Sequence, residues 1–110
     1  MAVNDTYVKS STGVADGADL IVDGSGSGTG EIDVSELGGT NGAAIYREVD
    51  TANDGSWSTV VEIDNNSGNW HTQLNNMRCV KNPVNGDSVR LRINNDSGSS
   101  GDYYVLGVEL

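Results

Sequence analysis

Residues 88–94 read Ser88-Val89-Arg90-Leu91-Arg92-Ile93-Asn94, an alternation of apolar and polar side chains over the whole stretch. Successive side chains of a β-strand point to opposite faces, so this period of two predicts a half-buried strand with both arginines facing solvent. The C-terminus has the same pattern, with one face made of Tyr104, Leu106, Val108 and Leu110. A third alternation runs from Trp57 to Asp64.

Weaker apolar stretches predict further strands, and turn residues separate them. The candidates are Thr6–Lys9, Ala18–Asp23, Glu31–Leu37, Ala43–Asp50, Trp70–Leu74 and Met77–Val80. Pairs such as Asp23-Gly24 and Asn41-Gly42 lie between them and tolerate the positive φ of tight turns. No window of about 11 residues carries a helical stripe. The rhythm predicts one all-β domain over residues 1–110, an antiparallel β-sandwich of about eight strands, in which residues 1–5 could form an N-terminal arm.

The charge of the chain excludes several classes of partner. Sixteen acidic residues stand against six basic ones, a net charge of −10 over 110 residues. Nucleic acids and anionic membranes are bound by basic surfaces, so neither is expected as a partner. The shell of like charges repels itself in dilute salt, and at about 1 M salt the Debye length falls to about 3 Å and screens it. We interpret the composition as salt adaptation, with an acidic mesophilic domain as the alternative.

Nothing in the sequence predicts catalysis, and no catalytic residue is assigned. His71 and Cys79 are the only histidine and cysteine. They could form a nucleophile and base if the stretches Trp70–Leu74 and Met77–Val80 were neighbouring strands, but no third group is suggested. The favoured interpretation is that Cys79 is a small buried apolar residue and His71 a surface residue. The segment Gly24–Gly30 lacks the residues of a phosphate-binding loop and is interpreted as a surface loop.

Oxygen-rich loops are the weak candidates for structural cations, and no other cofactor is expected. Asp50 and Asp54 precede a glycine as in the first half of an EF-hand loop. Ala52 and Val61 stand where that loop needs oxygen ligands, so the segment is interpreted as a hairpin turn. Loose cation sites are still conceivable at Asp50 with Asp54, or at Asp64 with Asn66.

The aromatic residues are divided between core and surface. In a chain without phenylalanine they are the largest apolar side chains, and Trp57 and Tyr104 are assigned to the core. Tyr46, Trp70 and Tyr103 are the candidates for a subunit interface or for a face that stacks on sugars. Three glycosylation sequons begin at Asn4, Asn65 and Asn95, and they matter only if the chain meets a glycosylation system.

Several stretches resemble the small virion proteins of haloarchaeal tailed viruses. They are Ala44–Asp50 (AIYREVD), Ser67–His71 (SGNWH), Val89–Asn94 (VRLRIN) and Asp102–Val108 (DYYVLGV). The resemblance covers most of the chain without a diagnostic motif, and it assigns no functional residue. It implies a jelly-roll β-sandwich on the capsid surface, as a turret or decoration, or on the tail. It also implies assembly in the host cytoplasm, which agrees with the absence of a recognisable signal peptide.

These observations favour a non-enzymatic structural subunit that forms a symmetric homo-oligomer, a trimer or pentamer, and contacts other capsid or virion proteins. A thin core gains from oligomerisation because association buries further apolar surface. A turret or decoration is favoured over a tail component. The alternative is a carbohydrate- or cell-surface-binding module that contacts host glycans, and a small hydrolase using His71 comes third.

Overall fold

The structure is a computed structural model that describes residues 6–24, 30–81, 83 and 86–110, and the side chains of these residues except 6–8 and 76. The fold is all-β, as predicted. The eight strands are β1 (Thr6–Val14), β2 (Asp19–Val22), β3 (Glu31–Gly39), β4 (Ala43–Asp50), β5 (Ser58–Asn66), β6 (Trp70–Val80), β7 (Ser88–Asn94) and β8 (Gly101–Glu109). The predicted N-terminal arm at residues 1–5 lies outside the described residues, as does most of the Gly24–Gly30 segment.

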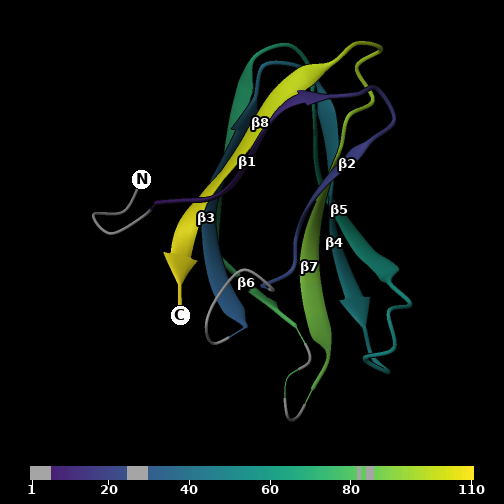
Figure 1. The fold of residues 1–110 in the computed structure, drawn as a ribbon, viewed down its shortest axis with the longest axis vertical. Coiled ribbons are helices and arrows are strands. Elements are labelled where there is room, and N and C mark those ends of the chain that lie inside the picture. The colour runs from purple at the N-terminus through teal and green to yellow at the C-terminus, as the bar shows by residue number, and fades with distance from the viewer. Residues whose placement is uncertain (1–5, 25–29, 82, 84–85) are drawn as a thin grey trace.

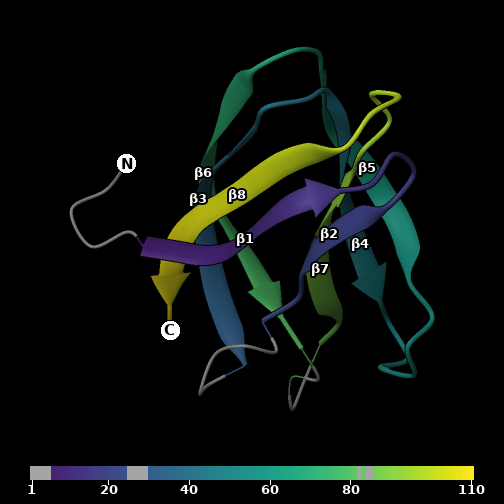
Figure 2. The same ribbon diagram turned by 45° about the horizontal axis from the view of Figure 1, so that its top comes forward.

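All the strand pairs are antiparallel and link the eight strands into one sheet, which can be divided at its narrowest junction into two groups of four. The pairing order is β1-β8-β3-β6-β7-β4-β5, and β2, which is outside this order, pairs with β7. β6 and β7 are joined through the single residue pair Val80 and Val89. The chain therefore divides into a β1-β8-β3-β6 group and a β2-β7-β4-β5 group, which lie on opposite sides of the molecule in Figures 1 and 2.

The core draws on both groups. Leu91 and Ile93 of β7 are buried while Arg90 and Arg92 reach the surface, which confirms the alternation predicted for this strand. The buried apolar cluster is Val14, Leu20, Val22, Ile32, Val34, Leu37, Ala43, Ile45, Cys79, Leu91, Ile93, Tyr103 and Val105. These side chains are small or medium in size, apart from Tyr103, as the composition implied.

Two strand predictions need correction. Trp70–Leu74 and Met77–Val80 are not neighbouring strands but parts of the single strand β6. The alternating burial predicted from Trp57 to Asp64 is not observed, because the consecutive residues Val60 and Val61 are both about half exposed, at 53% and 48%. The register between β4 and β5 shifts twice, and these irregularities break the two-residue period of the edge strand.

The two tyrosines of the C-terminal strand have the opposite phase from the one predicted. Tyr103 and Val105 are buried, whereas Tyr104 is partly exposed and Leu110 is 39% exposed; Leu106 is buried, as its place on the predicted face implied. In the register of β8 against β3, Gly39 pairs with Tyr103 and Gly38 with Tyr104. Each ring occupies the space that a Cβ would need at the glycine beside it. The core prediction for Tyr104 is therefore wrong, and Tyr103 takes that place.

Candidate functional site

A hollow with a volume of about 530 Å³ lies across β1, β8, β3 and β6. We call it the aromatic depression. Its lining residues are Ser10, Ser11, Thr12, Gly39, Thr40, Asn69, Trp70, His71, Asp102, Tyr103 and Tyr104. The size falls within the usual range of small-molecule sites, roughly 300–1,000 Å³.

Strand register brings these residues together. Ser10, Tyr104, Gly38 and His71 are aligned in one row across the four strands. The adjacent row contains Tyr103, whose ring is in the core, so the row of Tyr104 faces outward. Gly38 has no side chain, and the Tyr104 ring lies over it, with its hydroxyl donating to Glu36 Oε2 at 3.1 Å. The result is an aromatic ring held in place on the outer face of the sheet.

Trp70 and Tyr103 also line the depression, and they share the adjacent row, in which the Tyr103 ring faces the core. Trp70 Nε1 donates to the carbonyl of Asn41 at 2.6 Å, and Tyr103 Oη donates to that of Gly42 at 2.9 Å. The two ring centroids are 6.3 Å apart with a tilt of 45°. Burial raises the pKa of Tyr103, so its hydroxyl stays protonated and remains a donor. Both rings are therefore held by hydrogen bonds and packing.

The rim of the depression is polar, and hydrogen bonds hold Asp102 and Thr40 in place. Asp102 Oδ1 accepts from the Gly13 amide at 2.9 Å, and the Asp102 amide donates to Thr40 Oγ1 at 3.0 Å. Thr40 Oγ1 in turn donates to Asn41 Oδ1 at 2.9 Å. The lining contains a carboxylate, an amide and several hydroxyls but no lysine or arginine. Such a lining can form hydrogen bonds with a neutral polar ligand, and it offers no countercharge to an anion.

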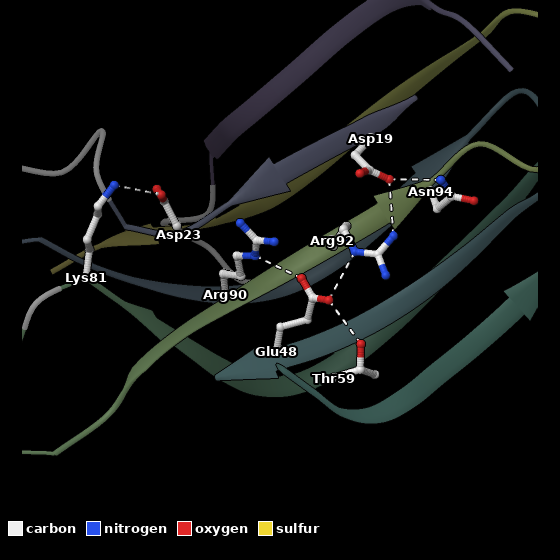
Figure 3. Close-up of polar contacts among 8 residues, drawn as sticks. All are labelled: Asp19, Asp23, Glu48, Thr59, Lys81, Arg90, Arg92 and Asn94. Atoms are coloured by element: carbon white, nitrogen blue, oxygen red, sulfur yellow. Dashed lines mark hydrogen bonds and ion pairs between the residues drawn. The ribbon is translucent and has the colours of Figure 1, made fainter. Parts of the chain in front are cut away.

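A second organised surface covers the outer face of the β2-β7-β4-β5 group, centred on Glu48 (Figure 3). Glu48 is 4% exposed and accepts from Arg90 Nε at 2.9 Å, Arg92 Nε at 3.1 Å and Thr59 Oγ1 at 3.0 Å. Burial raises the pKa of Glu48, but the hydrogen bonds from Arg90, Thr59 and Arg92 outweigh it and hold the pKa below its usual 4.5. Asp19 extends the network by pairing with Arg92 at 3.3 Å.

Aromatic rings lie against both guanidinium groups of this cluster. Arg90 lies 4.4 Å from the ring centroid of Trp57, and Arg92 lies 4.5 Å from that of Tyr46. Trp57 is therefore not a core residue as predicted, since it is partly exposed on the outer face. Each guanidinium thus contacts both a carboxylate and an aromatic ring of the same chain. We interpret the cluster as a structural element.

The cation candidates lie in two places. Asp50 accepts from the amides of Asp54 and Gly55, at 3.3 and 2.7 Å, and so closes the β4–β5 turn. Asp64 accepts from Thr72 Oγ1 at 2.9 Å and from the Asn65 amide at 2.8 Å. In the part of the chain that the structure describes, no three acidic, histidine or cysteine side chains come together as a metal site. Hydrogen bonding by these carboxylates explains the lowered pKa values of Asp50 and Asp64.

His71 and Cys79 do not form a pair. They lie at opposite ends of β6, with Cys79 fully buried and His71 exposed. The favoured interpretation of Cys79 as a buried apolar residue is therefore confirmed, and so is the surface position of His71. Burial raises the pKa of the Cys79 thiol to about 12.

We expect Cys79 to be inert in the folded chain. At pH 8 a thiol of pKa about 12 is ionised in roughly one molecule in ten thousand, and burial also denies it a reagent. Titration with an aromatic disulfide reagent should detect essentially no thiol in the native protein and one per chain in guanidinium chloride. A rapid reaction of the native protein would contradict the burial of this residue.

The sequons differ in whether the folded chain could carry a glycan on the asparagine. The Asn95 side chain is fully buried, and its amide nitrogen donates to the carbonyls of Val14 and Ser99, both at 2.8 Å. A glycan on that nitrogen would break both bonds, so Asn95 is a structural residue of the folded chain. Asn65 is exposed on β5, and Asn4 lies outside the described residues.

The sequence pointed to part of this site. Trp70 and Tyr103 were singled out, and both line the depression. Tyr104, His71 and the hydroxyl residues of β1 were not assigned to it. The dipeptides Gly38-Gly39 and Tyr103-Tyr104 carried a signal, because two rings side by side on one strand need space on the next. Tyr46 is partly exposed but lies on the other group of strands, beneath Arg92.

No protein-family model matches this chain, and no curated protein matches it. Within residues 6–24, 30–81, 83 and 86–110, no helix is suited to spanning a membrane.

Proposed function

We propose that this chain is a non-enzymatic structural subunit of a salt-adapted virus particle, a capsid turret or decoration protein that assembles as a symmetric homo-oligomer. The observation that carries the proposal is the pairing order, β1-β8-β3-β6 in one group and β2-β7-β4-β5 in the other. This order is compatible with a jelly-roll sandwich, an architecture used by viral capsid and lectin domains. We accordingly interpret the two groups as the two sheets of a jelly roll.

The outer edge of β5 supports association with other subunits. In the described residues β5 pairs on one side only, with β4. Its first residues, Ser58 to Val61, carry no charge, and Val60 and Val61 are the most exposed large apolar side chains of the described chain. Monomeric proteins usually protect such an edge with charged residues, so this edge is a candidate for contact with another subunit.

The distribution of charge supports assembly in concentrated salt. Among the described residues, ion pairs with acidic residues of the same chain engage four of the six basic side chains: Arg78, Lys81, Arg90 and Arg92. Few cations are thus left to attract the acidic surface of another subunit. Two such subunits repel each other in dilute salt, and molar salt removes most of that repulsion.

The proposal predicts that the oligomer depends on salt. We expect light scattering to detect monomers at about 0.1 M sodium chloride and a ring of three or five chains at about 3 M, because exposed charges are weakly screened in the first and strongly in the second. Val61→Asp should prevent assembly by placing a charge on the apolar edge. Ala52→Asp adds the same charge in the exposed β4–β5 turn and serves as the matched control.

A well-folded monomer at every salt concentration would count against assembly, and an oligomer unaffected by Val61→Asp would exclude the β5 edge. The virion assignment has its own test, since purified particles from the source should contain the chain in many copies. Its absence from such particles would rule out that assignment.

A further inference from the structure

We propose that the aromatic depression binds a neutral saccharide. This inference concerns a ligand site and does not rest on the virion proposal. The depression combines an aromatic ring, Tyr104, with an exposed imidazole, His71, on the same outward-facing row. Sugars present apolar C–H faces that pack on such rings and a rim of hydroxyls that need hydrogen bonds.

The position of Tyr104 is what makes it a platform. An exposed tyrosine on a strand would ordinarily rotate freely, but this ring lies over Gly38 and its hydroxyl is bound to Glu36. The conformational entropy of the ring is therefore already lost before a ligand arrives.

The polar groups around the ring match the second requirement of a sugar. Asn69 and Asp102 stand on the rim, together with hydroxyls of Ser10, Thr12 and Thr40. Asp102 and Thr40 are held by hydrogen bonds to backbone and side-chain groups of β1 and the β3–β4 turn. Amide, carboxylate and hydroxyl groups in fixed positions are suited to directional contacts with sugar hydroxyls.

Electrostatics decides in favour of a neutral ligand. No lysine or arginine lines the depression, Asp102 contributes a negative charge, and the chain as a whole carries −10. A sialylated, sulfated or phosphorylated glycan would meet like charge without a paired cation. The ligand that fits this lining is therefore a neutral hexose or N-acetylhexosamine, alone or at the end of a glycan.

Tryptophan fluorescence can report binding directly. The chain has two tryptophans, Trp70 at the depression and Trp57 on the other group of strands. In a Trp57→Phe background, Trp70 is the only indole. We expect neutral mono- and disaccharides, titrated at about 0.1 M and 3 M salt, to give a saturable change in its emission for at least one sugar. For a ligand of this size the Kd should be about 1 mM or tighter.

Variants locate the site. Tyr104→Ala should weaken binding about tenfold or more, while Tyr104→Phe keeps the ring over Gly38 and should largely restore it. His71→Ala changes an exposed side chain and should weaken binding without loss of folding, so the test survives if Tyr104→Ala does not fold. Tyr46→Ala removes a partly exposed ring from the other group of strands and should leave binding unchanged.

Three results would overturn the proposal. One is the absence of saturable binding to any neutral sugar at about 50 mM. Another is a preference for anionic glycans over their neutral counterparts. The third is binding that persists unchanged in both Tyr104→Ala and His71→Ala. None of these results bears on salt-dependent assembly, so failure of the saccharide site and failure of the structural role can be told apart.

Discussion

Asn95→Ala is expected to lower the free energy of unfolding by about 2–4 kcal/mol, a large part of the roughly 5–15 kcal/mol typical of a domain. The Asn95 side chain is fully buried between the β1–β2 turn and the β7–β8 loop. It donates to the carbonyls of Val14 and Ser99, and its Oδ1 accepts from the Ser97 amide at 3.0 Å and hydroxyl at 2.7 Å. The Asn95 side chain thus forms hydrogen bonds at both the β1–β2 turn and the β7–β8 loop.

The size of the effect follows from the groups left behind. Alanine would leave the carbonyls of Val14 and Ser99 and the Ser97 amide without this partner. The cost of about 1–3 kcal/mol for an unsatisfied buried group applies in full to the Val14 carbonyl, and less to the groups of Ser97 and Ser99, which are exposed. The main chain of Asn95 would keep its own bonds, at 2.9 Å to Ala18 and 2.6 Å from Gly17, so the fold should be weakened rather than lost. Asn95→Asp should also destabilise, because it places a carboxylate opposite the two carbonyls.

Urea denaturation followed by circular dichroism measures this change, and the melting temperature should fall by about 10 °C or more. Asn65→Ala is the matched control, since Asn65 also begins a sequon but is exposed, and its effect should stay within about 0.5 kcal/mol. Equal stabilities of the Asn65→Ala and Asn95→Ala variants would show that the buried network does not support the fold.

Much of the fold could be predicted from the sequence because burial on strands leaves a two-residue pattern. This pattern located β7, and turn pairs such as Asn41-Gly42 separated its neighbours. The pattern failed where both faces of a strand carry large side chains. Tyr103 and Tyr104 are chemically identical, and the choice between them is made by the register of β8 against β3, which is a long-range property.

The functional surfaces were harder to predict for the same reason. Pairing of β1 with β8 brings Ser10 beside Tyr104, and pairing of β3 with β6 brings Gly38 beside His71. Partners this far apart in the chain leave no local signal. The role of Asn95 was hidden differently, because an asparagine in a polar loop has the same local sequence whether its amide is exposed or buried.

Only part of the cluster around Glu48 could be predicted from the sequence. The outward direction of Arg90 and Arg92 followed from the alternation of β7. Which acid would lie between them depended on the register of β4 against β7, where Glu48 pairs with Arg90 and Tyr46 with Arg92. The structure supplies that register, and with it a quantitative expectation.

Replacing Glu48 should destabilise the fold by about 2–4 kcal/mol in Glu48→Ala and by somewhat less in Glu48→Gln. The carboxylate is 4% exposed and hydrogen-bonded to two guanidinium groups. Removing one partner of a buried ion pair costs about 3–5 kcal/mol, and we expect less here because both arginines reach solvent. Glu62→Gln on the adjacent strand β5 makes the same change at an exposed acid and should have an effect within about 0.5 kcal/mol.

Salt distinguishes this pair from the acidic surface. Exposed charges are screened by molar salt, whereas a buried pair is screened much less. The stability difference between the wild type and Glu48→Gln should therefore persist at about 2 M sodium chloride. Disappearance of the difference at that concentration would identify Glu48 as an ordinary surface charge.

The same pair sets the direction of the pH dependence. The pKa of Glu48 is held below its usual 4.5 in the folded chain, so the folded state favours the ionised form more than the unfolded state does. Its contribution is therefore fully present above about pH 5 and is lost as the pH falls through the folded-state pKa. Denaturation of the wild type and Glu48→Gln at pH 7, 5, 4 and 3 should give a difference that is constant down to about pH 5 and then shrinks. Acidification also relieves the repulsion among the other carboxylates, but it does so in both proteins, and the difference between them isolates Glu48. A difference that stays constant down to pH 3, or grows there, would contradict the lowered pKa and the ion pair that causes it.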